Sequence, residues 1–205
     1  MPANWFPPRP NNDKFFCVVG DPINHSKSPA IHQAFAAQLE LVLSYERVQV
    51  KAGDLSHAMA EFKRSGGNGM NVTVPLKTEA FALAEHKTAR AEAAGAANTL
   101  WFLSDGRLAA DNTDGAGLIR DLSHNHHVQL KDATVLLLGA GGAARGVVPS
   151  LLASGVKTLQ SSNRRAEKVT PLINELAAAQ RTEQAAWGGA EAAGADIIIK
   201  DTPAS

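Results

Sequence analysis

The chain of 205 residues carries a single cysteine, has no excess of charge of either sign, and contains few aromatic residues. Lys and Arg together number 20, as do Asp and Glu, so the formal net charge is zero. This balance argues against a nucleic-acid partner, because such partners are usually bound through a basic surface. Cys17 cannot form a disulfide within the chain, which suits a reducing compartment and predicts a cytoplasmic location.

Long hydrophobic runs are missing as well, so no membrane span and no membrane partner are expected. The first ten residues contain four prolines and lack the charged and apolar regions of a secretory signal peptide. We therefore predict an irregular N-terminal arm over residues 1–14, with the folded part of the chain beginning at about Phe15.

Segments that suit strands alternate along the whole chain with segments of helical periodicity, which predicts an α/β fold. For example, Ile31, Phe35 and Leu39 recur at helical spacing after Pro29, a residue favoured in the first turn of a helix. The expected strands are 15–20, 45–50, 70–74, 98–103, 108–110, 134–138, 156–161 and 196–199. The expected helices are 29–39, 55–63, 76–85, 115–123, one that begins at 142, and 165–179.

A glycine-rich turn follows the apolar run 135–138 and precedes a helical segment; its residues are Gly139, Ala140, Gly141, Gly142 and Ala143. A strand, then G-x-G-x-x-[GA], then a helix is the pattern of a dinucleotide-binding βαβ unit. The first glycine permits the tight turn, the second lets backbone N–H groups approach a pyrophosphate, and the helix N-terminus attracts the anion. We predict a dinucleotide site here, with a plain structural turn as the alternative.

The residues after the next predicted strand indicate which dinucleotide is bound. NAD sites usually place an acidic residue about 20 residues after the glycine motif, where it holds the ribose 2′-hydroxyl. Here the strand is followed by Asn163, Arg164 and Arg165, with Lys168 a turn later. Two guanidinium groups suit a 2′-phosphate, which favours NADP. A solvated basic helix start is the alternative.

The first half of the chain carries further polar motifs. Ser26 and Ser28 lie just before a predicted helix, where they could bind a small carboxylate or serve only as an N-cap. Asn71 and Thr73 share one face of a predicted strand, and Lys77 follows its closing proline. A lone lysine is ordinarily a solvated surface charge, so each motif by itself has a structural explanation.

Taken together, these motifs resemble those of the shikimate dehydrogenase family. The matching segments are N-x-S-K-S-P at 24–29, N-V-T-V-P-x-K at 71–77, G-A-x-N-T at 95–99, D-N-T-D-G at 111–115, G-A-G-G-A at 139–143 and N-R at 163–164. The resemblance runs from about Phe15 to Ile199. It implies an N-terminal α/β substrate domain over residues 15–114, followed by a Rossmann-type NADP-binding domain over 115–205 that lacks its C-terminal part.

The resemblance also implies an activity and a set of site residues. The family reduces 3-dehydroshikimate to shikimate with NADPH, a step of aromatic amino-acid biosynthesis that needs no metal. Ser26 and Ser28 would bind the substrate carboxylate, and Lys77 with Asp114 would form the catalytic pair. The ring hydroxyls would be bound by Thr73, Asn98 and Asp114, supported by Asn71. The cofactor would be held by Gly139, Ala140, Gly141, Gly142, Ala143, Asn163, Arg164, Arg165 and Lys168.

Other readings remain open at this point. A quinate/shikimate dehydrogenase using NAD or NADP would carry similar motifs, as would a truncated relative that binds a ligand without turnover. The chain departs from the family pattern at 200–203, where it reads K-D-T-P instead of N-A-T-[PS]. The family usually continues well beyond this length, so activity is doubtful for a chain that truly ends at Ser205. We expect a monomer or homodimer, and we interpret the His-rich segment 123–127 as a solvated loop.

Overall fold

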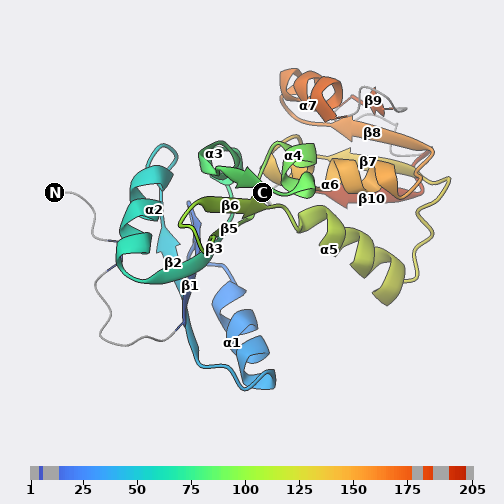
Figure 1. The fold of residues 1–205 in the computed structure, drawn as a ribbon. Helices are drawn as coiled ribbons and strands as arrows, with labels where there is room; N and C mark the ends of the chain where they lie inside the picture. The colour runs from blue at the N-terminus through green and yellow to red at the C-terminus, as the bar shows by residue number, and fades with distance from the viewer. Residues whose placement is uncertain (1–4, 7–13, 177–181, 187–193, 202–205) are drawn as a thin grey trace. The chain divides into compact units, whose positions relative to one another are not determined.

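A computed structural model describes residues 5–6, 14–176, 182–186 and 194–201. The chain forms two compact units (Figure 1). Unit 1 comprises Met1–Ala91 and Ala96–Asp111, and unit 2 comprises Glu92–Gly95 and Asn112–Ser205. The domain division predicted after residue 114 stays a prediction, although the structure places Asp114 in unit 2.

Unit 1 is built on a six-stranded mixed sheet with the order β2-β1-β3-β5-β6-β4. Parallel pairing joins β1 to both β2 and β3, whereas β5 pairs antiparallel with β3 and with β6. The β5–β6 hairpin turns at Gly106, whose φ of +84° favours glycine. The strands are β1 (Lys14–Gly20), β2 (Leu43–Gln49), β3 (Gly67–Val72), β4 (His86–Lys87), β5 (Thr99–Phe102) and β6 (Leu108–Asp111).

The helices of unit 1 cover the two faces of this sheet. They are α1 (Ser28–Gln38), α2 (Leu55–Arg64) and α3 (Lys77–Leu83); α4 (Ala89–Ala94) crosses the division between the units. Side chains alternate along β1, so Cys17 and Val19 point to one face while Phe16 and Val18 point to the other. The first face packs against α2, and the second lies toward α1.

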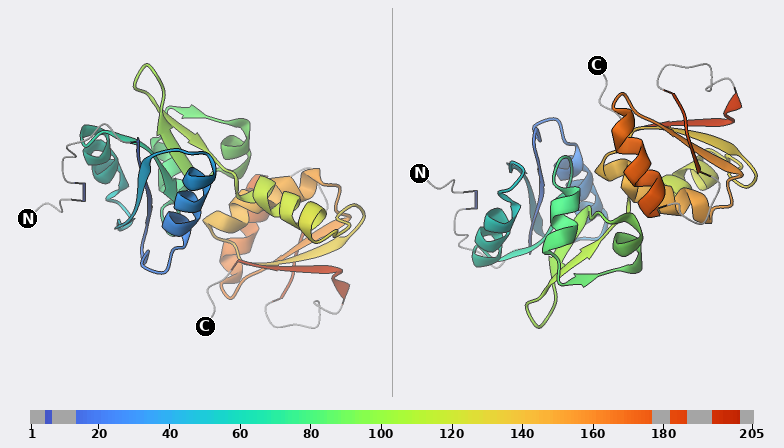
Figure 2. Two further views of the ribbon diagram at one scale, coloured as in Figure 1. Left: turned by 90° about the horizontal axis from the view of Figure 1, so that it is seen from below. Right: turned by 90° about the horizontal axis from the view of Figure 1, so that it is seen from above.

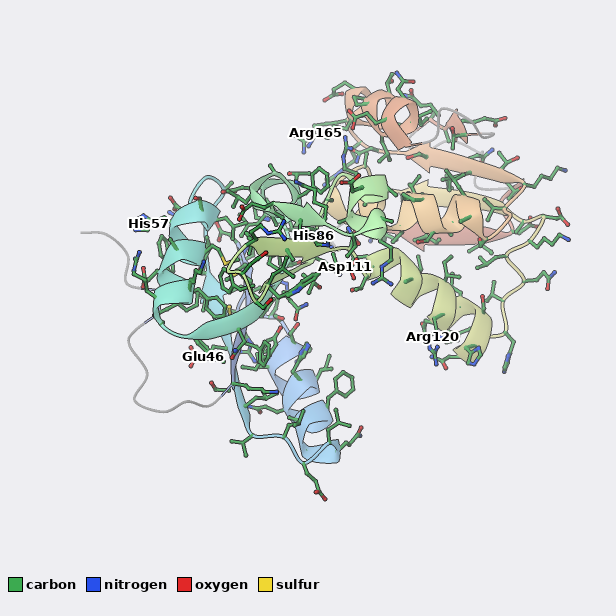
Figure 3. All side chains as sticks on the ribbon, viewed as in Figure 1. Glu46, His57, His86, Asp111, Arg120 and Arg165 are labelled. Atoms are coloured by element: carbon green, nitrogen blue, oxygen red, sulfur yellow. The ribbon has the colours of Figure 1, made fainter. Side chains whose placement is uncertain are left out.

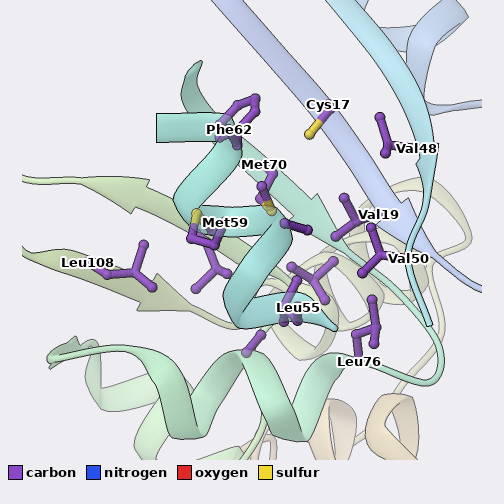
Figure 4. Close-up of a cluster of buried hydrophobic side chains, with 14 of the residues drawn as sticks. Cys17, Val19, Val48, Val50, Leu55, Met59, Phe62, Met70, Leu76 and Leu108 are labelled. Carbon is purple, nitrogen blue, oxygen red and sulfur yellow. The ribbon is translucent and has the colours of Figure 1, made fainter. Parts of the chain in front are cut away.

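The larger core of unit 1 lies between the sheet and α2 (Figure 4). Phe62 of α2 is fully buried and its ring lies 5.0 Å from that of Phe6 and 5.1 Å from that of Phe15. Phe6 was predicted to lie in an irregular arm, yet its side chain is only 2% exposed. Its backbone N–H donates to Glu61 Oε1. A short apolar piece of the N-terminal segment therefore completes the core.

The opposite face of the sheet is more polar and carries side chains of the predicted site. Tyr45 on β2 lies near Val18 and Phe16, and the registers of β3, β5 and β6 place Asn71 opposite Thr99 and Thr99 opposite Asp111. These residues therefore share one face across neighbouring strands. The sheet thus separates a hydrophobic core from a polar surface.

Unit 2 contains a four-stranded parallel sheet with the order β10-β7-β8-β9. The strands are β7 (Thr134–Leu138), β8 (Thr158–Ser162), β9 (Thr182–Gln184) and β10 (Ile197–Lys200). The helices are α5 (Asp114–Arg120), α6 (Gly142–Ala153) and α7 (Val169–Leu176), with a π-helical turn η1 (Asp121–Asn125) and a 3₁₀ turn η2 (Ala166–Lys168).

One face of this sheet packs against the helices. Val135 and Leu137 of β7 and Leu159 of β8 are buried in one cluster with Leu151 of α6 and Leu172 of α7. Helix α6 contacts both α5 and α7, so the three helices form a layer (Figure 2). This βαβ arrangement places the N-terminus of α6 at the carboxyl end of β7, where doubly wound proteins bind ligands.

Most expected elements are confirmed, with shifted ends, and several short ones were not predicted. The short elements β4, α4 and β9 were not predicted, and β3 begins at Gly67, whereas the expected strand began at residue 70. The predicted loop 123–127 is partly wrong, because η1 extends the α5 helix to Asn125. The helix predicted from Arg165 starts as the 3₁₀ turn η2, and its expected end at 177–179 lies outside the described residues. Among the described residues, none of the helices has the length and hydrophobicity to cross a membrane.

Candidate functional site

Ser26 and Ser28 form a hydroxyl pair at the start of α1. The Ser26 hydroxyl donates to Ser28 Oγ at 3.2 Å and accepts the Ser28 backbone N–H at 3.3 Å. Arg47 Nε of β2 donates to the Ser26 carbonyl at 2.9 Å, which fixes the loop before the helix. The N-cap residue is Lys27, so neither serine is the N-cap itself. Both hydroxyls are half-buried and remain suited to an anionic group.

Tyr45 joins this pair to the sheet, and the sequence analysis did not single it out. Its hydroxyl donates to Asn71 Oδ1 at 2.5 Å, and its ring stacks on His32 with 4.2 Å between ring centroids. Burial raises the pKa of the Tyr45 hydroxyl well above its usual value, and the nearby Cys17 adds to the rise. A hydrogen bond with Ser28 acts in the opposite direction on this pKa. Tyr45 therefore stays neutral and links Ser28 to Asn71.

Asn71 extends the network to the start of β5. Its amide Nδ2 lies 3.3 Å from Thr99 Oγ1 and 3.4 Å from the carbonyl oxygen of Asn98. Thr99 Oγ1 in turn donates to Asn98 Oδ1 at 2.9 Å. The backbone N–H of Asn98 donates to the carbonyl of Asp111 on β6. The structure thus brings together four predicted residues, Ser26, Ser28, Asn71 and Asn98, in one hydrogen-bonded network through Tyr45 and Thr99. We refer to these six residues as the polar network of unit 1.

Thr73 and Lys77 lie on the connection between β3 and α3. Thr73 donates its backbone N–H to Val19, and its side chain fills the space beside Gly20, where an added Cβ would come within 2.5 Å of it. The peptide bond between Val74 and Pro75 is cis. Lys77 is the first residue of α3 and is only 7% exposed, and its carbonyl accepts the N–H of Ala97. The alternative, that Lys77 is an ordinary solvated surface lysine, therefore does not hold.

Asp111 is a buried anchor that the sequence analysis did not assign. Its carboxylate accepts the Thr88 hydroxyl at 2.6 Å and is held by both Nε and a terminal nitrogen of Arg90. Asp111 is labelled in Figure 3. These contacts with Asp111 raise the pKa of the Arg90 guanidinium. They join Thr88, and Arg90 of α4, to the first residue of the D-N-T-D-G motif, at the end of β6. The motif contains two aspartates, and the sequence alone does not show which of them has a structural role and which a catalytic one.

Asp114 begins α5 and belongs to unit 2, whereas Lys77 belongs to unit 1. The Asp114 backbone N–H donates to Asn112 Oδ1 at 3.1 Å. An added Cβ on Gly146 of α6 would lie 2.9 Å from the Asp114 carboxylate, so this carboxylate rests against the α6 backbone. Gly115 likewise has no room for a side chain beside Ser150. These close approaches fix Asp114 to the helix that the glycine turn begins.

The glycine turn has the geometry that its sequence predicts. Gly139 has a φ of +145° and donates its N–H to the carbonyl of Ser162, which joins the ends of β7 and β8. Gly141 is the N-cap of α6, and an added Cβ there would meet nothing within 4 Å in the part of the chain that the structure describes. The space beside Gly141 is therefore open. Backbone N–H groups in the first turn of α6 lack partners within the helix and suit a phosphate.

The predicted basic residues follow β8 directly. Asn163 Oδ1 accepts the backbone N–H of Arg165 at 2.9 Å, forming a tight turn at the strand end. Arg164, Arg165 and Lys168 are exposed, and Arg165 is labelled in Figure 3. Within the described residues, the neighbouring buried hydroxyls of Ser161 and Ser162 have no hydrogen-bond partner. The turn and the basic residues fit a phosphorylated dinucleotide such as NADP. An acidic side chain, Asp201, bonds to the first turn of α6.

Strand, glycine turn, helix and basic strand end together define unit 2 as an α/β domain of the dinucleotide-binding class. The family models agree with this reading and extend it. One described as the shikimate dehydrogenase substrate binding domain matches residues 18–100, and one described as shikimate / quinate 5-dehydrogenase matches residues 121–205. The chain belongs to the shikimate dehydrogenase family.

Similar proteins support this assignment. The chain is 45% identical over 194 residues to a shikimate dehydrogenase (NADP(+)) of Marinobacter nauticus, covering 93% of this chain and 70% of that protein. It is 52% identical over 167 residues to one of Aromatoleum aromaticum, covering 82% of this chain and 58% of that protein. Among solved structures, Thermus thermophilus shikimate 5-dehydrogenase in complex with NADP(H) and shikimate is 32% identical, with a TM-score of 0.80 over 92% of this chain and 68% of that chain.

Proposed function

We propose that the protein interconverts 3-dehydroshikimate and shikimate with NADP(H), with unit 1 binding the substrate and unit 2 the cofactor. The observation that carries the proposal is the polar network of unit 1. Four residues of the family motifs lie in it, although they come from separate segments of the chain: Ser26 bonds to Ser28, and Asn71 bonds to Asn98. Tyr45 connects the two pairs through its hydrogen bonds with Ser28 and Asn71. Polar residues without a common function would not be expected to hold one another in position in this way. The names of the similar proteins agree with this activity.

In this proposal the two serine hydroxyls bind the substrate carboxylate at the N-terminus of α1. Hydroxyl donors and a helix N-terminus both favour a negative charge. Thr73, Asn98 and Asp114 bind the ring hydroxyls, and Asn71 supports them. Asn71 is held by Tyr45 on one side and contacts Thr99 on the other, so its orientation is fixed before any ligand binds. Preorganisation of this kind reduces the entropic cost of binding.

Lys77 and Asp114 are proposed as the catalytic pair. NADPH, when bound, supplies a hydride from C4 of its nicotinamide ring. Lys77 would stabilise the negative charge that develops on the substrate oxygen, and the pair would supply the proton. General acid catalysis contributes roughly 10²–10⁴-fold to a rate. Burial of Lys77 favours this role, because a desolvated ammonium interacts more strongly with a developing charge.

The cofactor would be bound by backbone and by basic side chains. The turn from Gly139 to Ala143 would hold the pyrophosphate, and Asn163 would position the loop that follows β8. Arg164, Arg165 and Lys168 would bind the adenosine 2′-phosphate, since guanidinium groups pair with phosphate through two hydrogen bonds. We further propose a cytoplasmic location and a monomer or homodimer as the working form.

The test is an assay of NADPH oxidation by the purified protein with 3-dehydroshikimate. We expect NADPH to be preferred over NADH, and 3-dehydroshikimate over 3-dehydroquinate. Comparable turnover of 3-dehydroquinate would replace this proposal by the quinate/shikimate alternative, which the second family model also names. Binding of shikimate and NADPH without any turnover would contradict the catalytic proposal and support a ligand-binding relative.

A further inference from the structure

Asp201 lies where β10 ends, directly beside the glycine turn. Its backbone N–H donates to the carbonyl of Leu138 at 2.8 Å, continuing the pairing of β10 with β7. An added Cβ on Gly139 would lie 3.0 Å from the Asp201 Cβ and 3.1 Å from its carbonyl oxygen. Asp201 is therefore packed against the first glycine of the dinucleotide motif.

The carboxylate of Asp201 is bonded to the first turn of α6. Its Oδ2 accepts the backbone N–H of Ala144 at 2.8 Å, although the two residues are 57 positions apart in the sequence. Ala144 is the third residue of α6, so its N–H is one of those that the helix itself leaves without a partner. The chain thus places its own negative charge at the helix end that would attract a phosphate.

This contact has two opposite effects. A carboxylate at a helix N-terminus stabilises the helix, because it interacts favourably with the positive end of the helix dipole. The same carboxylate repels a second anion at that helix end and occupies one of its donors. A dinucleotide pyrophosphate carries negative charge and uses these same N–H groups.

We propose that Asp201 sets the cofactor affinity of unit 2, by competing with the dinucleotide pyrophosphate for the first turn of α6. The proposal rests on the proposed function, because it takes NADP(H) as the ligand of the glycine turn. Asp201 acts as a positioning and affinity-setting residue, and it takes no part in the chemistry. It holds the turn in shape when the cofactor is absent and opposes the cofactor's charge as it binds.

If Asp201 serves only as a structural cap of α6, a different result is expected. If Asp201 only stabilised α6, its replacement would lower stability and leave cofactor affinity unchanged or weaker. The competition proposal predicts effects of opposite sign, namely lower stability and tighter binding. Measuring both the stability and the NADPH affinity therefore distinguishes the structural role from the competition.

The experiment compares Asp201→Asn with Asp196→Asn in the purified protein. Asp196 is a matched control, because its carboxylate also accepts a backbone N–H, that of Thr134 at 2.7 Å, at the other end of the β10–β7 pair. The dissociation constant of NADPH is measured by nicotinamide fluorescence, and that of inorganic pyrophosphate by calorimetry. Urea unfolding gives the stability of each variant.

We expect Asp201→Asn to tighten NADPH and pyrophosphate binding by roughly three- to tenfold, with lower stability. Asp196→Asn should leave both affinities within about twofold. Unchanged or weaker binding in Asp201→Asn, or equal tightening in both variants, would overturn the inference while leaving the cofactor proposal in place. If neither the parent protein nor Asp201→Asn binds NADPH, both this inference and the cofactor proposal are wrong.

Discussion

The polar residues of the two units are held in different ways. In unit 1 the predicted substrate residues are hydrogen-bonded to one another, and Tyr45 links the helix start to the sheet. In unit 2 the predicted cofactor residues are backbone groups of a glycine turn and exposed basic side chains. Ser161 and Ser162, at the end of β8, are buried without a hydrogen-bond partner among the described residues.

This difference corresponds to two kinds of recognition. A small ring with several hydroxyls must be distinguished by the direction of each hydrogen bond, so its site needs fixed side chains. A pyrophosphate is bound through its charge and by main-chain N–H groups, so its site needs open space and an exposed helix end. We therefore expect unit 1 to respond to the loss of single hydroxyl or amide groups, and unit 2 to respond to changes in space and charge.

The largest effect is expected at Lys77. Replacing Lys77 with Ala should lower kcat by roughly 10²–10⁴-fold, because the developing charge on the substrate loses its stabilising group. The dissociation constant of shikimate should change only a few-fold. Lys63→Ala is a control in the same unit, since Lys63 is exposed and its Nζ donates to the carbonyl of Gly106 and lies over the ring of Phe102. An unchanged kcat in Lys77→Ala would contradict the catalytic assignment.

Gly141→Ala tests whether unit 2 depends on open space. The backbone φ of Gly141 is −93°, which alanine adopts readily, and an added methyl group would meet no atom of the described residues within 4 Å. Stability should therefore fall by less than about 1 kcal/mol, an N-cap effect. The methyl group would occupy the space proposed for the pyrophosphate, so NADPH affinity should fall by about tenfold or more. The NADPH affinity is measured by fluorescence titration, and the shikimate affinity should be the same as in the parent protein. An unaltered NADPH affinity would refute the assignment of the pyrophosphate to the glycine turn.

Tyr45→Phe tests the polar network of unit 1. The substitution removes one hydroxyl and leaves Asn71 Oδ1 without its hydrogen-bond donor. The loss of a buried hydrogen bond costs about 1–2 kcal/mol in unfolding free energy. Because Asn71 is then less well oriented, the KM for shikimate should rise several-fold while the NADPH affinity stays constant. A KM equal to that of the parent protein would show that Tyr45 has no part in orienting the site.

The smallest effect is expected at Ser161. Ser161→Ala removes a buried hydroxyl that has no partner among the described residues, so urea unfolding should show unchanged stability or a gain of up to about 1 kcal/mol. Ser65→Ala is the contrasting variant in unit 1, because the Ser65 hydroxyl donates to the Phe6 carbonyl at 2.6 Å. That variant should lose about 1 kcal/mol. Equal losses of stability in Ser161→Ala and Ser65→Ala would contradict the expected difference between the two units.

Local patterns predicted much of the fold, because the apolar strands and periodic helices carry their own signals. The strand β7, the glycine turn and the start of α6 follow directly from residues 134–142. In contrast, β4 has only two residues and exists because it pairs with β6, so its own sequence could not reveal it. The start of β3 at Gly67 likewise depends on pairing with β1.

The site was predicted to a different extent in each unit. Motif residues such as Ser28 and Asn71 were found because the family pattern marks them. Tyr45 was missed, because its partner Asn71 lies 26 positions away and nothing nearby in the sequence identifies it; that it is the only tyrosine of the chain was the one available signal. The contact of Asp201 with Ala144 is equally non-local, and only the parallel pairing of β10 with β7 produces it.

The most direct test of the proposed division, with shikimate bound by unit 1 and NADPH by unit 2, is whether binding of each ligand can be abolished separately. Shikimate and NADPH are titrated separately into the parent protein, Ser28→Ala and Gly141→Ala, with each dissociation constant measured by calorimetry. The account predicts that Ser28→Ala weakens shikimate binding by about tenfold or more and leaves NADPH binding unchanged, and that Gly141→Ala does the reverse. Loss of both ligands in either variant, or shikimate binding that is unaffected by Ser28→Ala, would contradict it.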